Sequence, residues 1–257
     1  MFYGRENERK KLCTMFHSDG QMISLIYGRR RIGKSELIKQ VLKETDIKSV
    51  YYECKQTTEQ NNVDSLAELI GEAFDFPKPA FENMEDLLCF LFQKSEKEPM
   101  ILVLDEYPYL RENSKGLDSV LQSVIDHYKD TSNMKLIVCG SYVDTMKALL
   151  ERQNPLYGRI DLTLNLKPMD YYDSALFYPE FSEEDKVRLF SVFGGIPYYN
   201  RLIDEKKSVR ENIIELIASS GARLENEVAM YLNSEISKIT RVLHLNMFVI
   251  TGYSFKL

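Results

Sequence analysis

The segment from Gly28 to Ser35 restricts the fold of this chain more than any other, because it reads GRRRIGKS between an apolar stretch and a helix-forming stretch. The preceding stretch, Met22 to Tyr27, has the length and apolar character of a buried strand. Lys34 to Glu44 then places apolar residues at helical spacing. A glycine-rich loop between a strand and a helix aims backbone N–H groups at phosphate. The sequence therefore predicts a phosphate-binding loop in an α/β fold.

Each residue type in this loop suits a task at a phosphate. Gly28 and Gly33 permit a tight turn close to the ligand. Lys34 brings positive charge to the β and γ phosphates of a nucleotide, and Ser35 is expected to ligate magnesium. The arginines at 29–31 either contact phosphate or a neighbouring subunit, or they are solvated charges. The residues expected to bind ATP or ADP here are Gly28, Arg29, Arg30, Arg31, Ile32, Gly33, Lys34, Ser35 and Glu36.

Two acidic residues end another apolar run, in MILVLDEYPYL. Met100 to Leu104 is typical of a buried parallel strand, and Asp105 and Glu106 follow it. Without the phosphate-binding loop, a helix cap or a surface turn would be the favoured interpretation of such a pair. Beside a phosphate-binding loop, we expect Asp105 to hold magnesium directly or through water, and Glu106 to orient or deprotonate an attacking water.

Two more residues are candidates for the catalytic group. Ser141 ends the apolar strand of KLIVCGSYVDTM, where it is suited to contact the γ phosphate or the attacking water, or to cap a helix that begins near Val143. Arg159, in PLYGR, precedes the next predicted strand; it either stabilises charge on the γ phosphate, in the same chain or a neighbour, or has no such role. The predicted catalytic residues are Lys34, Glu106, Ser141 and Arg159.

Strands and helices alternate up to residue 166, which indicates a parallel sheet covered on both faces. After Pro168 the chain becomes rich in aromatic residues and its apolar spacing is helical. We therefore expect a nucleotide-binding domain at 1–167 and a smaller helical domain at 168–257. Further strands are predicted at 50–54, 100–104, 135–139 and 160–166. A short amphipathic helix is predicted at the N-terminus, where Leu12, Met15 and Phe16 share one helical face. Further helices are predicted at 63–74, 84–94, 117–128, 143–150, 185–193, 197–202, 209–217 and 224–237.

The composition narrows the class of protein. With 257 residues, 44% of them hydrophobic and 28% charged, the chain can bury a full core and is neither disordered nor fibrous. A formal net charge of -6 does not favour DNA binding by this chain alone. The charged N-terminus is unlike a signal peptide, and the apolar runs are too short to span a bilayer. We expect a cytoplasmic protein that does not contact a membrane.

Six motifs, in the order in which they occur, resemble those of the additional-strand class of P-loop ATPases. More narrowly, the chain is similar over nearly its whole length to the AAA-like, STAND-related family often called archaeal-type ATPases, which also occurs in bacteria. The resemblance implies a three-layer α/β sandwich with the P-loop strand central in a parallel sheet, followed by a small helical lid. The motifs are FYGRENE, IYGRRRIGKSELI, LVLDEYPYL, CGSYVDTM, NPLYGR and FGGIPYYN.

The resemblance also assigns residues outside the loop. It implies that Gly4 and Arg5 lie near the adenine side of the nucleotide. In related STAND proteins a glycine-proline motif in the lid contacts the nucleotide, and Gly195 and Pro197 match it. The alternative is a simple turn before a helix, because proline is favoured at an early helical position.

The C-terminal end departs from the family pattern. Similar proteins usually continue past the lid into a winged helix and often a nuclease-like domain, whereas this sequence ends at Leu257. The apolar residues of NMFVITGYSFKL have no obvious partner element. We expect residues beyond about 222 to be the stub of a further domain.

Three functions fit these observations. The leading one is a magnesium-dependent ATPase that works as a conformational switch, read by self-association or by an unknown protein partner. The second is a nucleotide-binding module with negligible turnover alone. The third is the ATPase subunit of a DNA-processing system, which would reach DNA only through a missing C-terminal domain. A kinase is disfavoured because the sequence reveals no acceptor pocket.

Overall fold

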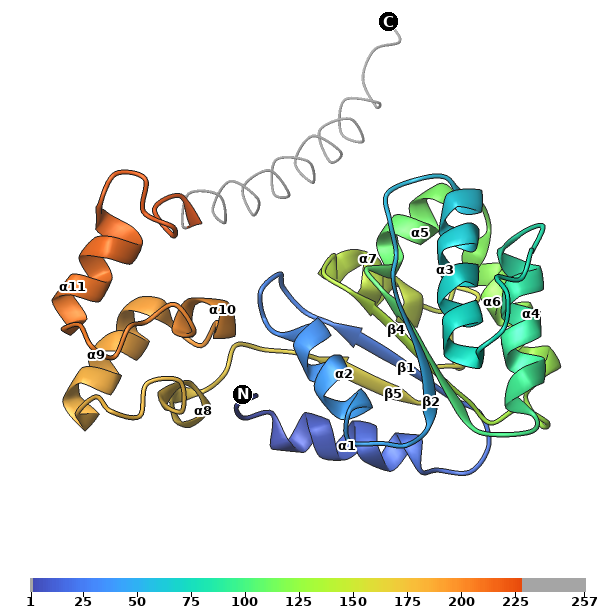
Figure 1. Cartoon of the computed structure of the whole chain (residues 1–257), viewed down its shortest axis with the longest axis horizontal. Coiled ribbons are helices and arrows are strands. Elements are labelled where there is room, and N and C mark those ends of the chain that lie inside the picture. The colour runs from blue at the N-terminus through green and yellow to red at the C-terminus, as the bar shows by residue number, and fades with distance from the viewer. Residues whose placement is uncertain (1, 228–257) are drawn as a thin grey trace, which may run out of the picture. The chain divides into compact units, whose positions relative to one another are not determined.

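The computed structural model describes residues 2–227, and its largest feature is a five-stranded parallel sheet (Figure 1). The strand order across the sheet is β2-β3-β4-β1-β5, so the strand before the glycine-rich loop is an interior strand. This order confirms the predicted α/β fold with a parallel sheet. The strands are β1 (Met22–Tyr27), β2 (Lys48–Glu53), β3 (Met100–Asp105), β4 (Met134–Gly140) and β5 (Leu162–Asn165).

Helices follow most of the strands, as expected for parallel connections. Short turns of other types extend two of them, a 3-10 turn at Ala148–Leu150 and a π-helical turn at Ile214–Ala218. The helices up to the fourth strand are α1 (Glu6–Phe16), α2 (Lys34–Leu42), α3 (Glu59–Phe74), α4 (Met84–Ser95), α5 (Tyr107–Asn113) and α6 (Leu117–His127). The later ones are α7 (Val143–Lys147), α8 (Tyr171–Ala175), α9 (Glu183–Phe193), α10 (Pro197–Asn200) and α11 (Val209–Ile213).

Side-chain alternation along the strands divides the core into two clusters, one on each face of the sheet. On β3, Leu102 and Leu104 join the cluster under α3, α4 and α6, whereas Ile101 and Val103 join the cluster under α1 and α2. Both faces of the sheet are therefore covered, which gives three layers (Figure 1). The strands read as continuous apolar runs for the same reason.

The register of the sheet brings three chain segments to one edge. Tyr27 of β1 pairs with Gly140 of β4, and Leu104 of β3 pairs with Val138 of β4. Because all strands are parallel, the residues that follow β1, β3 and β4 lie together at their carboxyl ends. In the sheet, β4 lies between β1 and β3. The residues after β4 therefore lie between the glycine-rich loop that follows β1 and the acidic pair Asp105 and Glu106 at the end of β3.

The structure adds two helices that the sequence analysis did not predict, α5 and α8. α5 has seven residues, YPYLREN, and α8 has five, YYDSA, so neither is long enough to show a helical period. The predicted helix at 224–237 starts in turns at 224–226, and its part beyond 227 lies outside the described residues. The expected stub of a further domain lies mostly outside them too.

The chain divides into two compact units. The first comprises Met1–Leu176 and Gly195–Tyr198, and the second contains the described residues 177–194 and 199–227. Side-chain caps begin the helices of the second unit: Ser182 accepts from the N–H of Asp185 at α9, and a reciprocal capping box begins α11. The predicted domain boundary near residue 167 stays a prediction. No helix within residues 2–227 has the length and apolar character needed to cross a membrane.

Candidate functional site

The two glycines of the loop are required for different physical reasons. A Cβ at Gly28 would lie 2.6 Å from the carbonyl oxygen of Leu166, so a side chain there would collide with the backbone after β5. Gly33 has φ of 90° and precedes α2, in the left-handed region that favours glycine. The loop therefore turns tightly at both ends of GRRRIGKS, and its last residues open a helix whose N-terminus attracts anions.

Lys34 is buried, with 5% of its surface exposed, and its ammonium is held inside the loop. Its Nζ donates to the carbonyl oxygens of Gly28 at 3.0 Å and Arg29 at 3.2 Å, and to the Ser141 hydroxyl at 2.7 Å. Burial lowers the pKa of Lys34, and the nearby acidic groups partly offset this effect. The lysine thus links the loop to the end of β4, and contact of Ser141 with the γ phosphate or the attacking water stays a prediction.

Asp105 is buried and receives several hydrogen bonds. Ser35 Oγ donates to its Oδ2 at 2.6 Å, the Tyr51 hydroxyl donates to the same oxygen, and the Glu106 N–H donates to Oδ1 at 2.9 Å. Burial alone would raise the pKa of Asp105, but these hydrogen bonds outweigh it and the pKa lies below its usual value. Ser35 and an ionised Asp105 therefore meet, which is the pairing predicted for a magnesium site.

The sequence analysis did not single out Tyr51. It lies on β2, where it pairs with Val103 of β3, and its hydroxyl reaches across to Asp105. Burial, followed by this hydrogen bond, raises the pKa of Tyr51 well above its usual value, so it stays a donor. No local pattern signals this contact, because it depends on β2 lying beside β3.

Glu106 and Ser141 face each other across the ends of β3 and β4. The backbone N–H of Ser141 donates to Glu106 Oε2 at 3.1 Å, and its hydroxyl donates to Oε1 at 2.5 Å. Glu106 has φ of 51°, a strained conformation for a residue with a side chain. The alternative role of Ser141 as a helix cap is wrong, because the N-cap of α7 is Tyr142 and no side chain caps that helix.

The arginines of the loop have defined surroundings. Arg30 Nη2 donates to the hydroxyls of Tyr109 at 2.9 Å and Tyr142 at 3.3 Å. The guanidinium carbon of Arg31 lies 4.6 Å from the centroid of the Tyr198 ring, within cation–π range. Contact of either arginine with phosphate stays a prediction, as do the roles of Arg29, Ile32 and Glu36.

The residues assigned to the adenine side support the far end of the loop. Arg5 is buried and its Nη2 donates to the carbonyl oxygens of Ile32 at 3.2 Å and Lys167 at 2.6 Å. Gly4 has φ of 63°, and a Cβ there would meet the Asp173 carboxyl carbon at 2.5 Å. Arg5 therefore ties the N-terminus to the loop, and the lack of a side chain at Gly4 lets the backbone approach α8 closely. Contact with adenine stays a prediction.

Two residues of the FGGIP motif, Gly195 and Pro197, pack within the first unit. Gly195 accepts a hydrogen bond from the Met169 N–H at 2.8 Å, and a Cβ on Gly195 would lie 1.9 Å from the Met169 carbonyl oxygen. Pro197 begins α10, which is the helix-start alternative, and its Cγ is 3.7 Å from where a Gly33 Cβ would lie. Pro197 therefore stands beside the loop as well as starting a helix, and its contact with a nucleotide stays a prediction.

Arg159 is not brought to this site. Its Nε and Nη2 donate to both carboxyl oxygens of Asp126, at 2.7 and 2.6 Å. The N–H of Asp161, two residues later, bonds to Ile23 near the start of β1 at 2.8 Å. The loop begins at the other end of β1, about 16 Å away at the usual rise per strand residue. The same-chain catalytic role is therefore wrong, and only the role toward a neighbouring subunit stays a prediction.

Arg159→Ala is expected to cost a small, pH-dependent amount of stability, about 0.5 kcal/mol near neutral pH, because the ion pair is partly exposed. The hydrogen bond from Arg159 lowers the pKa of Asp126. A lowered carboxyl pKa stabilises the folded state above about pH 4, and this contribution is lost as the pH falls through the folded value. Thermal unfolding of both proteins from pH 7 to pH 3 checks this. An equal difference at every pH would instead assign the loss to packing.

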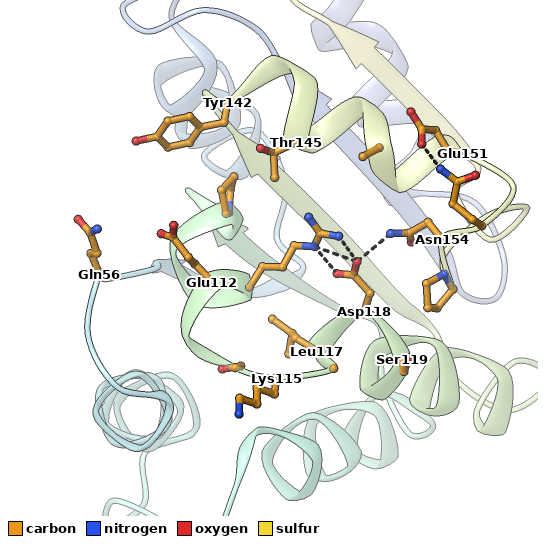
Figure 2. Close-up of a pocket in the computed structure, with 17 residues that line it drawn as sticks. Gln56, Glu112, Lys115, Leu117, Asp118, Ser119, Tyr142, Thr145, Glu151 and Asn154 are labelled. Atoms are coloured by element: carbon orange, nitrogen blue, oxygen red, sulfur yellow. Dashed lines mark hydrogen bonds and ion pairs between the residues drawn. The ribbon is translucent and has the colours of Figure 1, made fainter. Parts of the chain in front are cut away.

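A separate pocket of about 890 Å³ lies beside α5, α6 and α7 (Figure 2). In its wall, the buried Asp118 accepts from Arg111 Nε at 2.9 Å, from the Tyr107 hydroxyl at 2.7 Å and from Asn154 at 2.8 Å. Tyr142 also lines this pocket. The internal pairing of Asp118 gives it a structural role that holds the corner between α5 and α6.

Comparison with known proteins identifies the family. Residues 2–203 match the family described as an ATPase domain predominantly from Archaea. The chain belongs to this ATPase family. An uncharacterized protein of Methanocaldococcus jannaschii is 30% identical to this archaeal-type ATPase over 200 residues, which cover 77% of this chain and 43% of that protein. The chain thus spans less than half of that relative.

Solved structures share the fold of this archaeal-type ATPase. The Walker-type ATPase of Pyrococcus abyssi has a TM-score of 0.62 at 21% identity, and covers 93% of this chain and 76% of its own. The ORC2 protein of Aeropyrum pernix, solved with ADPNP and ADP, has a TM-score of 0.57 at 16% identity, over 89% of this chain and 63% of its own. At these identities the likeness establishes a P-loop ATPase fold.

Proposed function

We propose that this chain binds ATP with magnesium and hydrolyses it to ADP and phosphate, as a conformational switch. One observation carries the proposal. The run of hydrogen bonds Lys34–Ser141–Glu106 lies beside the Ser35–Asp105 pair, at the edge of the sheet where the P-loop ends. A counter-charge for phosphate, a magnesium ligand set and a base for water are thereby assembled from three neighbouring strand ends.

Phosphate binding falls to the loop and Lys34. Backbone N–H groups between Gly28 and Ser35 cradle the α and β phosphates, and the start of α2 adds its dipole. Lys34 exchanges its carbonyl partners, Gly28 and Arg29, for oxygens of the β and γ phosphates. Because burial already disfavours its charged form, an anionic partner stabilises the ammonium more than neutral carbonyls do.

The residues fit magnesium. Ser35 and Asp105 offer a hydroxyl and a carboxylate oxygen 2.6 Å apart, the hard ligands that magnesium prefers. Residues 2–227 contain no cluster of three or more His, Cys, Asp or Glu side chains for a metal, but magnesium at a nucleotide takes its other ligands from phosphate and water. When bound, the ion neutralises charge that develops on the β and γ phosphates. Tyr51 would keep Asp105 ionised and oriented.

Hydrolysis falls to Glu106. A water oxygen attacks the γ phosphorus, the bond to the oxygen that bridges the β and γ phosphates breaks with its electrons going to ADP, and Glu106 takes the proton of the water. Ser141 holds both carboxylate oxygens of Glu106 and thereby fixes its direction. The strained backbone of Glu106 is a cost of the kind that active sites carry.

The second unit is the proposed moving part. The chain leaves the first unit at Leu176, returns for Gly195–Tyr198 and leaves again, and this short return contains Pro197 beside Gly33 and Tyr198 under Arg31. A change in the loop on hydrolysis would thus act on a segment joined at both ends to the second unit. A partner or a second copy would read the change.

Two alternatives are weaker. A nucleotide-binding module without turnover would not need Glu106 held against Ser141. A DNA-processing role is supported by the fold alone. The ORC1 protein of Aeropyrum pernix, whose structure was solved in complex with DNA, is only 15% identical to this chain. The net charge of -6 disfavours DNA contact through this chain by itself.

The test is steady-state release of phosphate from ATP by the purified chain, with magnesium and with EDTA. We expect release that requires magnesium. Tight ATP binding without release, even with magnesium, would favour the module, and lack of nucleotide binding would reject the proposal.

A further inference from the structure

Arg30 is held in a defined position by two tyrosines. The sequence alone left open whether it contacts phosphate or is a solvated charge. Its Nη2 is shared between the hydroxyls of Tyr109 and Tyr142. The guanidinium carbon also lies 5.6 Å from the centroid of the Tyr142 ring. The two rings meet edge to face, with centroids 5.9 Å apart. A pair of tyrosines therefore anchors an arginine of the phosphate loop.

These anchors lie on the hydrolytic side of the site. Tyr109 stands in the first turn of α5, where its N–H donates to the carbonyl oxygen of Glu106 at 3.0 Å. Tyr142 follows Ser141 directly. Arg30 is thus held by the neighbours of the two residues that we assign to the attacking water. This side of the loop is where the γ phosphate must lie for Glu106 to act on it.

The guanidinium is free to take an anion. Both of its hydrogen bonds within residues 2–227 use Nη2, so the N–H groups on Nε and Nη1 have no protein partner there. The side chain is exposed. Burial is the main cause of the lowered pKa of Lys34, and the charge of Arg30 lowers it further, so the two cations interact electrostatically. A guanidinium fork suits the oxygens of a phosphate.

Three other arginines have partners away from the position expected for the γ phosphate. Arg5 is buried against backbone carbonyl oxygens, Arg31 lies over Tyr198, and Arg159 pairs with Asp126 at the opposite edge of the sheet. We propose that Arg30 is a catalytic residue that contacts the γ phosphate, and that Tyr109 and Tyr142 are its positioning residues. This inference rests on the proposed function and supplies the cation that Arg159 does not provide within the chain.

The first test compares Arg30→Ala with the parent and with Arg152→Ala, which removes another exposed arginine of the same unit. We expect Arg30→Ala to lower kcat at least about 100-fold. We also expect a loss of affinity for a non-hydrolysable ATP analogue about tenfold larger than the loss for ADP. Arg152→Ala should match the parent in both. The affinity ratio decides the matter even if the isolated chain does not turn over.

The second test examines the tyrosines. A Tyr109→Phe, Tyr142→Phe double variant keeps both rings and removes both hydroxyls, so we expect kcat to fall about tenfold with KM little changed. In an Arg30→Ala background the same pair should cause no further loss, because the hydroxyls act through Arg30. Equal losses in both backgrounds would show that the tyrosines support the fold only.

The outcomes separate the two levels of inference. If Lys34→Ala weakens nucleotide binding while Arg30→Ala keeps parental kcat and a parental ratio of affinities, the role of Arg30 is rejected and the proposed function stands. If neither nucleotide binds the parent, both are rejected.

Discussion

Glu106→Gln is expected to lower ATP turnover by about 10² to 10⁴-fold while ATP stays bound, because the amide cannot accept the proton of the attacking water. The substitution keeps the size of the side chain, and a glutamine oxygen still accepts one bond from Ser141. The carboxylate follows a buried strand and is connected to Lys34 of the loop through Ser141, which the amide oxygen can still bind, so nucleotide affinity should change little.

Phosphate release and equilibrium binding of ATP, measured on the same preparations, check this result. Glu112→Gln is the matched control, since Glu112 is an exposed glutamate on α5, the short helix that begins directly after Glu106. A Glu106→Gln protein that hydrolyses ATP at the parental rate would remove Glu106 as the base. Parallel loss of binding and turnover would instead assign it a role in holding the nucleotide.

Lys34→Ala is expected to weaken binding of ATP about 100-fold, because it removes the charge-assisted hydrogen bonds to the β and γ phosphates. The ammonium is buried inside the loop, and burial lowers its pKa. The ammonium is therefore less stable here than it would be in water, as expected for a group whose role is to bind an anionic ligand. The folded chain should tolerate its removal.

Titration with a fluorescent ATP analogue, together with a thermal unfolding curve, tests this expectation. Lys43→Ala provides the control, because Lys43 is exposed just beyond the last residue of the same helix, α2. An unchanged affinity with normal unfolding would refute the assignment of GRRRIGKS as the phosphate loop. A collapsed melting temperature would mean that Lys34 mainly supports the loop structure.

Most of the fold and the centre of the site could be predicted from patterns of consecutive residues. β1 was predicted at its observed bounds, Met22–Tyr27, because a buried strand, a glycine-rich loop and a helix follow one another without interruption. Asp105 and Glu106 were predicted as site residues for the same reason, because they directly follow an apolar run. The side-by-side position of Ser141 and Glu106 then followed from parallel strands with neighbouring carboxyl ends.

Contacts between segments that are distant in the sequence could not be predicted from it. The hydrogen bond of Tyr51 to Asp105 needs β2 beside β3, and the anchoring of Arg30 by Tyr109 needs α5, which is too short to show a period. Arg159 was predicted as a candidate because it precedes a strand, but the direction of that strand was not taken into account. A residue that precedes a parallel strand lies at the far edge of the sheet, away from the loop, so strand direction decides its distance from the phosphates.

The return of Gly195–Tyr198 to the first unit has a practical consequence for dissecting this protein. An expression fragment cut at residue 167 or 176 would lack Gly195, which packs against Met169, and Pro197, which stands beside Gly33. Such a fragment would expose apolar and backbone surface next to the phosphate-binding loop. A faithful minimal unit therefore has to be built by joining residue 176 to residue 195 through a short designed linker, rather than by simple truncation.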